Sequence, residues 1–252
     1  MDSLLTNLVL AATLGLQLVI LYLLLRGGSR RRFPWFLTYI VYEICETIVR
    51  FSAAGNRPLY FKVYWITAIG GSILSILAVA ESFLHVFWMY ARLRWFTWIV
   101  WGCVALALVY SAFKAWLFPP VQANRIQTLI IGLEVAVDYS IGIVGILYFV
   151  LVLFARIKDH QRESGIISGF TTIAVVSVLG ALIRSVFGRE KFPILNRWLG
   201  SVAYLIAEVE WILALIRQER QVAPPPQNFT IKDVTMFDQY IRILGRLLGR
   251  KS

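Results

Sequence analysis

Acidic residues occur in this chain within segments that are otherwise apolar. The segment from Phe33 to Arg50, FPWFLTYIVYEICETIVR, is long enough to span a membrane, yet it contains Glu43, Glu46 and Arg50. Residues three and four apart are neighbours on a helix, so these three side chains share one face. Ionisable groups in membrane spans face the interior of a helical bundle and mark candidate functional sites. The segment therefore predicts a polar site that is enclosed by other helices.

Further ionisable residues occur in the other apolar segments. Counting about 1.5 Å per residue along helices places Glu43, Glu81 and Glu208 at similar depths, near the middle of the bilayer. The same count places the remaining acidic groups and two arginines in the outer half, where opposite charges lie at similar depths. The candidate ligand- or ion-binding residues are Glu43, Glu46, Arg50, Glu81, His85, Glu134, Asp138, Arg184 and Glu208.

Three interpretations of these residues remain open. In the first, Arg50 and Arg184 neutralise the outer carboxylates in a network that fixes helix packing. In the second, the residues line an outward-facing cavity that binds a small charged or zwitterionic ligand. In the third, the carboxylates and His85 form a pathway for protons or cations.

Motifs for other chemistry are missing. The sequence has no nucleophile elbow, phosphate loop or HExxH motif. The pair Glu81 and His85 lacks a further nitrogen donor, because the only other histidine, His160, belongs to a loop. Cys45 and Cys103 are interpreted as buried thiols without metal-ligand spacing. We therefore expect no metal, no cofactor and no enzymatic activity.

Composition indicates an all-α, polytopic membrane protein, since 59% of the residues are hydrophobic and 15% are charged. A bundle of seven spans of roughly 20 to 25 residues uses nearly the whole chain. We expect a bundle domain over residues 1–220 and a cytoplasmic tail over residues 221–252. The predicted spans are Leu4–Leu25, Phe33–Arg50, Tyr60–Tyr90, Phe96–Phe118, Ile126–Phe154, Gly165–Phe187 and Ile194–Ile216.

The net charge of +11 reflects membrane topology and not binding to nucleic acid. Most of the 25 basic residues follow the first, third, fifth and seventh spans, and the positive-inside rule places those connections in the cytoplasm. The prediction is a multi-pass protein of a bacterial inner membrane, with its N-terminus outside and its C-terminus in the cytoplasm.

The tail combines a stiff spacer with an amphipathic helix. Pro224, Pro225 and Pro226 precede a segment whose apolar residues recur at spacings of three and four. Its basic side suits either the anionic lipid surface of the inner leaflet or a protein partner, cytoplasmic or membrane-bound. The basic residues are Arg242, Arg246, Arg250 and Lys251.

The runs RRRFPWFLTYIVYE and YFKVYWITAIGGSILSILAVAESF resemble uncharacterised bacterial seven-helix membrane proteins. More remotely, they are similar to the seven-helix input domains of bacterial histidine kinases, although no kinase domain follows the seventh span. The resemblance implies a seven-helix architecture and, by analogy, a ligand-sensing or scaffold role. The alternatives are a proton- or ion-coupled transporter of small solutes and a structural subunit of a membrane complex.

The topology predicts opposite results for reporters fused at two positions. The C-terminus at Ser252 is predicted to lie in the cytoplasm and the connection at Asn56 outside, because five spans, an odd number, separate the two positions. A reporter that is active only in the cytoplasm should therefore work at Ser252, and one that is active only outside should work at Asn56. Paired alkaline phosphatase and fluorescent protein fusions measure this directly. A C-terminus outside the cytoplasm would contradict the predicted orientation.

Overall fold

The computed structural model is all-helical over the part of the chain that it describes. The described residues are 2–26, 29–53, 55–87, 102, 105, 109, 125–154, 161–187 and 193–217. The helices are α1 (Asp2–Arg26), α2 (Pro34–Ala53), α3 (Arg57–Phe87), α5 (Arg125–Phe154), α6 (Gln161–Phe187) and α7 (Pro193–Ile216), with a short 3-10 helix η1 (Ser29–Arg31). They belong to one compact unit, residues 1–218. The predicted tail helix, with Arg242, Arg246, Arg250 and Lys251, lies outside the described residues.

Five of these helices, α1, α3, α5, α6 and α7, are long and apolar enough to cross a membrane. The chain is therefore an all-α protein of the membrane type. α2 is long enough as well, but its 20 residues hold Glu43, Glu46 and Arg50. Of the fourth predicted span, the structure describes only Gly102, Ala105 and Val109.

The predicted boundaries agree with the helices to within a few residues, with one informative exception. The loop predicted before the sixth span is already helical from Gln161 onward. Glu163 lies in the first turn of α6, where a negative charge favours a helix start. It is fully buried and forms an ion pair with Arg32. This ion pair between distant parts of the chain lets α6 begin earlier than its apolar pattern indicates.

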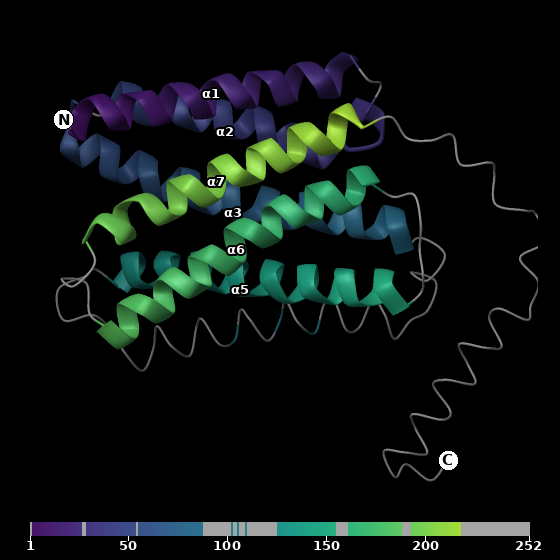
Figure 1. Ribbon diagram of the computed structural model, residues 1–252. Helices are drawn as coiled ribbons and strands as arrows, with labels where there is room; N and C mark the ends of the chain where they lie inside the picture. Colours follow the sequence, from purple (N-terminus) through teal and green to yellow (C-terminus); the bar gives the residue numbers. More distant parts are fainter. Residues whose placement is uncertain are drawn as a thin grey trace, which may run out of the picture. The chain divides into compact units, whose positions relative to one another are not determined.

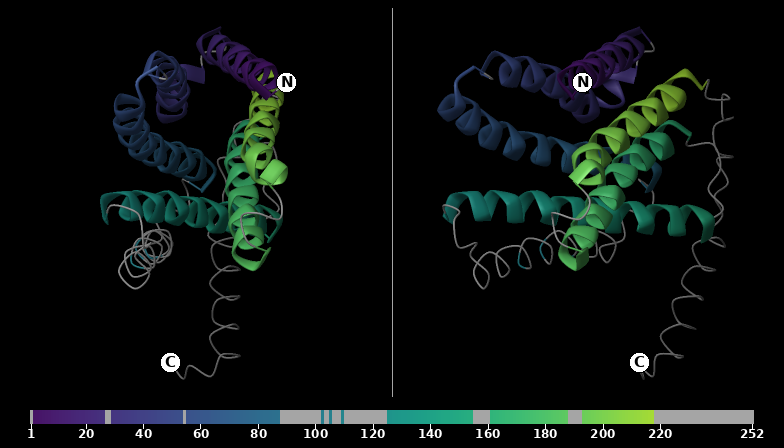
Figure 2. Two further views of the ribbon diagram at one scale, coloured as in Figure 1. Left: turned by 90° about the vertical axis from the view of Figure 1, so that its left-hand side faces the viewer. Right: turned by 60° about the vertical axis from the view of Figure 1, so that its left-hand side comes forward.

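The pairs α1–α2, α2–α3, α5–α6 and α6–α7 run in opposite directions, whereas α3 and α5 run in the same direction (Figure 1). The contacts of these helices close a ring (Figure 2). α1 packs on α2, α2 on α3, α3 on α5, α5 on α6, α6 on α7, and α7 returns to α1. α3 also packs on α6 across this ring. The ring encloses the polar face of α2, while Ile48, Val49 and Phe51 on its other face are exposed. Cys45 is also exposed, so its expected burial is wrong.

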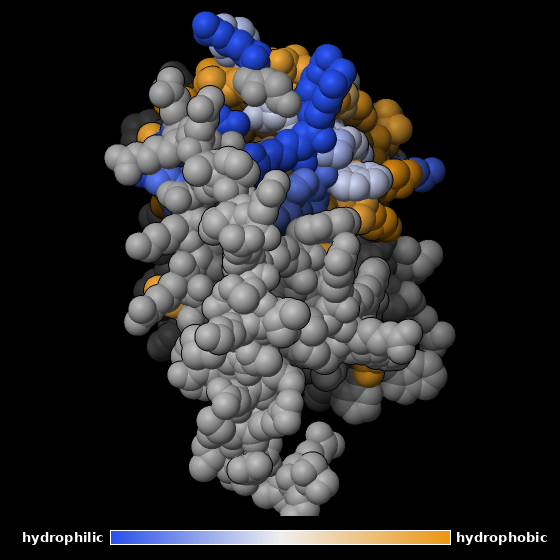
Figure 3. Space-filling model, turned by 90° about the vertical axis from the view of Figure 1, so that its right-hand side faces the viewer, coloured by the Kyte–Doolittle hydropathy of each residue, from blue (hydrophilic) through white to orange (hydrophobic). Residues whose placement is uncertain are grey.

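Basic residues gather at one end of the ring, where α1 and α7 end and α6 begins (Figures 1 and 3). Arg30, Arg31 and Arg217 are exposed there. Arg162 donates a hydrogen bond to Ser29 at 3.2 Å, which ties the start of α6 to the connection after α1. Figure 3 shows the resulting hydrophilic cap above the apolar sides of the helices. The arginines of distant connections therefore share one side of the structure.

An aromatic cluster holds α2, α6 and α7 together. The ring of Trp211 contacts those of Phe36, Tyr39 and Phe170 at centroid distances between 4.9 and 6.0 Å. The indole nitrogen of Trp211 also donates a hydrogen bond to the carbonyl oxygen of Ile166 at 3.0 Å. Gly169 makes room for this indole, because a side-chain carbon at this position would overlap it. A small residue is therefore required where α6 and α7 cross, as is common in membrane helix pairs.

Replacing Gly169 by alanine should destabilise the bundle by about 1 to 3 kcal/mol, the usual cost of adding a methyl group to a well-packed contact. The midpoint of thermal unfolding in detergent measures the effect. Gly200→Ala is the matched control, because a side-chain carbon at that position of α7 meets nothing within 4 Å. Equal midpoints for the two variants would show that the close contact between Gly169 and Trp211 contributes nothing to stability.

Candidate functional site

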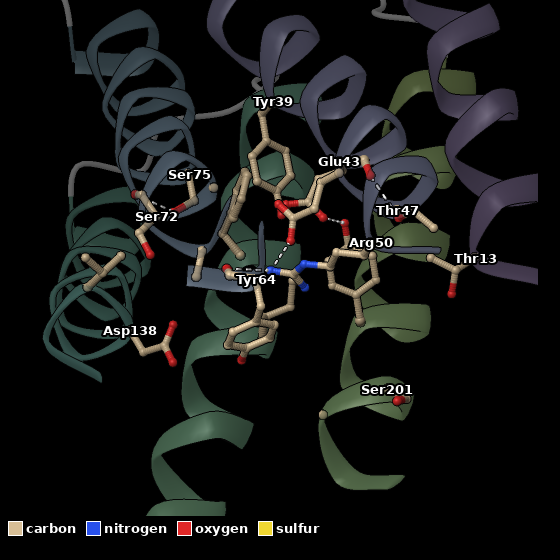
Figure 4. Close-up of a pocket in the computed structure, with 18 of the residues that line it drawn as sticks. Thr13, Tyr39, Glu43, Thr47, Arg50, Tyr64, Ser72, Ser75, Asp138 and Ser201 are labelled. Carbon is tan, nitrogen blue, oxygen red and sulfur yellow. Dashed lines mark hydrogen bonds and ion pairs between the residues drawn. The ribbon is translucent and has the colours of Figure 1, made fainter. Parts of the chain in front are cut away.

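A cavity of about 660 Å³ lies inside the ring and is lined by all six described helices. Its wall includes the first half of α1, the second half of α2, the first half of α3 and the start of α7. These parts lie at the end of the ring opposite the arginine-rich end (Figure 1). The polar groups that point into the cavity are shown in Figure 4. The ionisable residues of its lining, apart from tyrosines, are Glu43, Glu46, Arg50 and Asp138.

Arg50 is held in place by four contacts from α2 and α3. Its guanidinium forms an ion pair with Glu46, one turn earlier on the same helix. Its Nε donates to the Thr67 hydroxyl at 3.0 Å, and the guanidinium lies over the ring of Tyr64, 4.5 Å from the centroid. A terminal nitrogen also approaches the carbonyl oxygen of Tyr64 at 3.5 Å. The positive charge of the cavity is therefore already committed to Glu46 and to α3.

Glu43 lies about two helical turns before Arg50 on α2 and has a different environment. The hydroxyl of Tyr204 on α7 donates a hydrogen bond to its carboxylate at 3.2 Å. Tyr39, one turn earlier on α2, also interacts with this carboxylate (Figure 4). Among the described residues no cation lies within ion-pair distance of Glu43. Its charge is therefore held by hydroxyl groups and not by a basic side chain.

Close packing of α2 on α3 brings these groups to the cavity. The ring of Tyr42 fills the space beside Gly70, and the Tyr42 hydroxyl donates to the carbonyl oxygen of Thr67 at 2.8 Å. A side-chain carbon at Gly71 would lie 3.5 Å from the carboxylate of Glu43 and 3.6 Å from that of Glu46. The two glycines thus let both acidic side chains lie against the backbone of α3.

Asp138 enters the cavity from the opposite wall, on α5 (Figure 4). It accepts a hydrogen bond from the hydroxyl of Ser177 on α6. This contact fixes the carboxylate at the interface of α5 and α6. At Asp138 the structure therefore shows a contact with a neutral hydroxyl group, and the expected pairing of this carboxylate with an arginine stays a prediction. The side chains of Glu134 and Arg184 lie outside the described residues, so their part in the network stays a prediction.

Glu81 and His85 lie away from the cavity. The carboxylate of Glu81 accepts the backbone N–H groups of Trp35 and Phe36 at 3.1 Å, and so it caps the first turn of α2. Glu81 is therefore about 12 Å along α2 from Glu43, at 1.5 Å per residue, and the predicted common depth is wrong for it. His85 is exposed and contacts the ring of Phe33 edge-on at 5.4 Å. Both residues serve the packing of α2 on α3.

Glu208 is fully buried on α7 and is not part of the cavity wall. It interacts electrostatically with Glu43 and lies beside Gln17 of α1. The structure thus places Glu208 near Glu43. Within the described residues there is no group of three or more histidine, cysteine, aspartate or glutamate side chains that would hold a metal ion.

Several polar residues of the site are uncharged and are therefore missing from the residues that the sequence predicts for it. Tyr39 and Tyr204 hold Glu43, and Gln17 connects α1 to Tyr204. A signal for two of them was present: Gln17 interrupts an apolar run, and Tyr204 precedes Glu208 by one helical turn. The other uncharged polar side chains in the lining are Thr13, Thr47, Tyr64, Ser72, Ser75, Trp198 and Ser201.

Comparison of the chain with protein-family models, with curated proteins and with solved structures found no match.

Removing the positive charge of the cavity should destabilise the protein unless its partner is also neutralised. Arg50→Gln leaves the buried carboxylate of Glu46 without its guanidinium. We expect a loss of about 2 kcal/mol, less than the ~3–5 kcal/mol of a fully buried pair, because Arg50 remains 27% exposed. The double variant Glu46→Gln/Arg50→Gln should recover most of the thermal stability. A double variant as unstable as the single one would assign the effect to the contacts of Arg50 with α3.

Proposed function

We propose that this chain is a non-enzymatic, seven-helix protein of a bacterial inner membrane that binds a small ligand in the cavity between its helices. Its N-terminus lies outside and its C-terminus in the cytoplasm, so the cavity faces the outer side. The role is ligand sensing or scaffolding, and the C-terminal amphipathic helix conveys the bound state to the lipid surface or to a protein partner. The cavity and the ionisable residues of its lining, Glu43, Glu46, Arg50 and Asp138, are the observation that carries this proposal.

The size and lining of the cavity support a small-molecule site. Its volume of about 660 Å³ lies within the range of roughly 300–1,000 Å³ that is usual for ligand pockets. Apolar walls with a few converging polar groups are typical of such sites. The location supports access from one side, because the lining residues lie at the end of the ring that is opposite the arginine-rich end.

The charges of the cavity favour a ligand with a positive group. Among the described lining residues, three carboxylates, those of Glu43, Glu46 and Asp138, face one guanidinium, that of Arg50, which is paired with Glu46. A cation would compensate the charge of Glu43, whereas an anion would meet repulsion from it. The rings of Tyr39, Tyr64 and Tyr204 add faces that attract ammonium groups. The proposed ligand is therefore a small organic cation or a zwitterion with an ammonium group.

A transporter is the alternative that the same site supports. Discontinuous helices near the middle of the membrane are common in substrate-coupled transporters. The described helices α1, α2, α3, α5, α6 and α7 are each continuous along the cavity, which favours a receptor. The buried acidic pair Glu43 and Glu208 favours proton-coupled transport instead. A third role, as an assembly subunit, predicts a stable co-purifying partner and no response to ligand.

Ligand binding can be measured on the full chain in lipid nanodiscs through tryptophan fluorescence, because Trp198 lines the cavity. We expect choline and glycine betaine to change the emission and acetate to leave it unchanged. Glu43→Gln should weaken binding at least roughly tenfold, since it removes the negative charge that attracts the quaternary ammonium group of these ligands.

Glu210→Gln is the matched control for this experiment, because it neutralises a carboxylate of α7 outside this cavity. Absence of any response to choline and betaine in the folded protein would contradict the proposed ligand class. Accumulation of labelled choline in liposomes that contain the protein would decide for the transporter.

A further inference from the structure

The carboxylate of Glu208 has an unusual environment. The residue is 0% exposed, and neither of its side-chain oxygens has a hydrogen-bond partner among the described residues. No described cation forms an ion pair with it. An ionised carboxylate without donors is very costly in an apolar interior, and a neutral carboxylic acid is far less so. The surroundings of Glu208 therefore favour the protonated form.

The donors in this region are directed toward Glu43. The side-chain amide nitrogen of Gln17 lies 3.3 Å from the Tyr204 hydroxyl and donates to it. The Tyr204 hydroxyl in turn donates to Glu43 at 3.2 Å. Both of these hydrogen bonds are directed toward Glu43, whereas neither oxygen of Glu208 is within hydrogen-bond geometry of a described donor. Of the two neighbouring carboxylates, Glu43 is thus arranged to carry the charge.

A proton on Glu208 would also satisfy a second buried group. The side-chain oxygen of Gln17 is buried and has no hydrogen-bond partner among the described residues. Because Gln17 lies beside Glu208, a carboxylic acid hydroxyl supplies the donor that this oxygen lacks. One bound proton therefore removes the buried charge of Glu208 and supplies the donor that the Gln17 oxygen lacks.

The helices around Glu208 bring no described positive charge to it. α2 contributes Glu43 and Tyr39, α1 contributes the neutral Gln17, and Tyr204 lies one turn earlier on α7 itself. On α6, the described ionisable side chains are Arg162 and Glu163 in its first turn. These bond to Ser29 and Arg32 near the arginine-rich end.

We propose that Glu208 is a proton-binding site linked to the cavity through Gln17, Tyr204 and Glu43. The pair Glu43 and Glu208 holds one proton, which resides on Glu208, and one negative charge, which resides on Glu43. Like charges close together disfavour each other, so the charge of Glu43 keeps the proton on Glu208. A cation bound beside Glu43 weakens this hold and releases the proton. That last consequence rests on the proposed function, whereas the proton site itself does not.

Infrared spectroscopy of the full chain in lipid nanodiscs tests the site without any ligand. The C=O stretch of a protonated carboxyl group is distinct from that of a carboxylate. At neutral pH we expect a carboxylic acid band in the wild type that is lost in Glu208→Gln. The same band should persist in Glu210→Gln, a control two residues away whose carboxylate accepts from the Thr172 hydroxyl at 3.3 Å. Retention of the full band in Glu208→Gln would overturn the proposal.

The link to the cavity is tested in Glu43→Gln. Without the neighbouring negative charge, Glu208 should lose its proton at lower pH, so the band should disappear at lower pH than in the wild type. An unchanged titration of the band would overturn the link between Glu208 and the cavity.

Because glutamine replaces an already neutral Glu208, the folded fraction of Glu208→Gln should match that of Glu210→Gln. Unfolding of the Glu208 variant alone would show that its ionised form is needed and would also overturn the proposal.

Discussion

The polar face of α2 must be kept away from lipid. α2 holds Glu43, Glu46 and Arg50 on one face, and a bilayer has no partners for these groups. The closed ring of contacts among α1, α2, α3, α5, α6 and α7 meets this requirement, because it encloses that face. The arrangement of the other helices is thus tied to a few polar side chains on a single helix. The cavity is the space that remains beside those side chains.

Four carboxylates of the described bundle have different partners. Glu46 pairs with a guanidinium, Glu81 accepts the free N–H groups of a helix start, and Asp138 accepts from a hydroxyl. Glu43 is held by tyrosine hydroxyls. The first two arrangements need no further partner, and they account for packing. Glu43 and Asp138 are held by hydroxyl groups in the wall of the cavity, where the proposed ligand would meet them.

The aromatic cluster around Trp211 links this site to the rest of the fold. Tyr39 contacts Trp211 with its ring and interacts with Glu43 through its hydroxyl, so one side chain belongs both to the core and to the site. Tyr204 similarly contacts Trp211 edge-on at 6.2 Å and donates to Glu43. A change in the charge of Glu43 therefore acts directly on residues that hold α2, α6 and α7 together. This connection is a physical route by which occupancy of the cavity can alter helix packing.

The sequence by itself determined the helical membrane class, most helix boundaries and the common face of Glu43, Glu46 and Arg50 on one helix, because apolar length and helical spacing are local properties. Only the tertiary structure decided which polar groups meet. The sequence predicts Glu81 at the polar site, but in the structure its carboxylate caps the first turn of α2. This position of Glu81 depends on how α3 packs against α2. Tyr39 gave no signal in the sequence, and the signals of Tyr204 and Gln17 were weak, because uncharged polar residues are tolerated in many positions. Their role arises only where three helices bring them to one carboxylate, and that proximity is a property of packing.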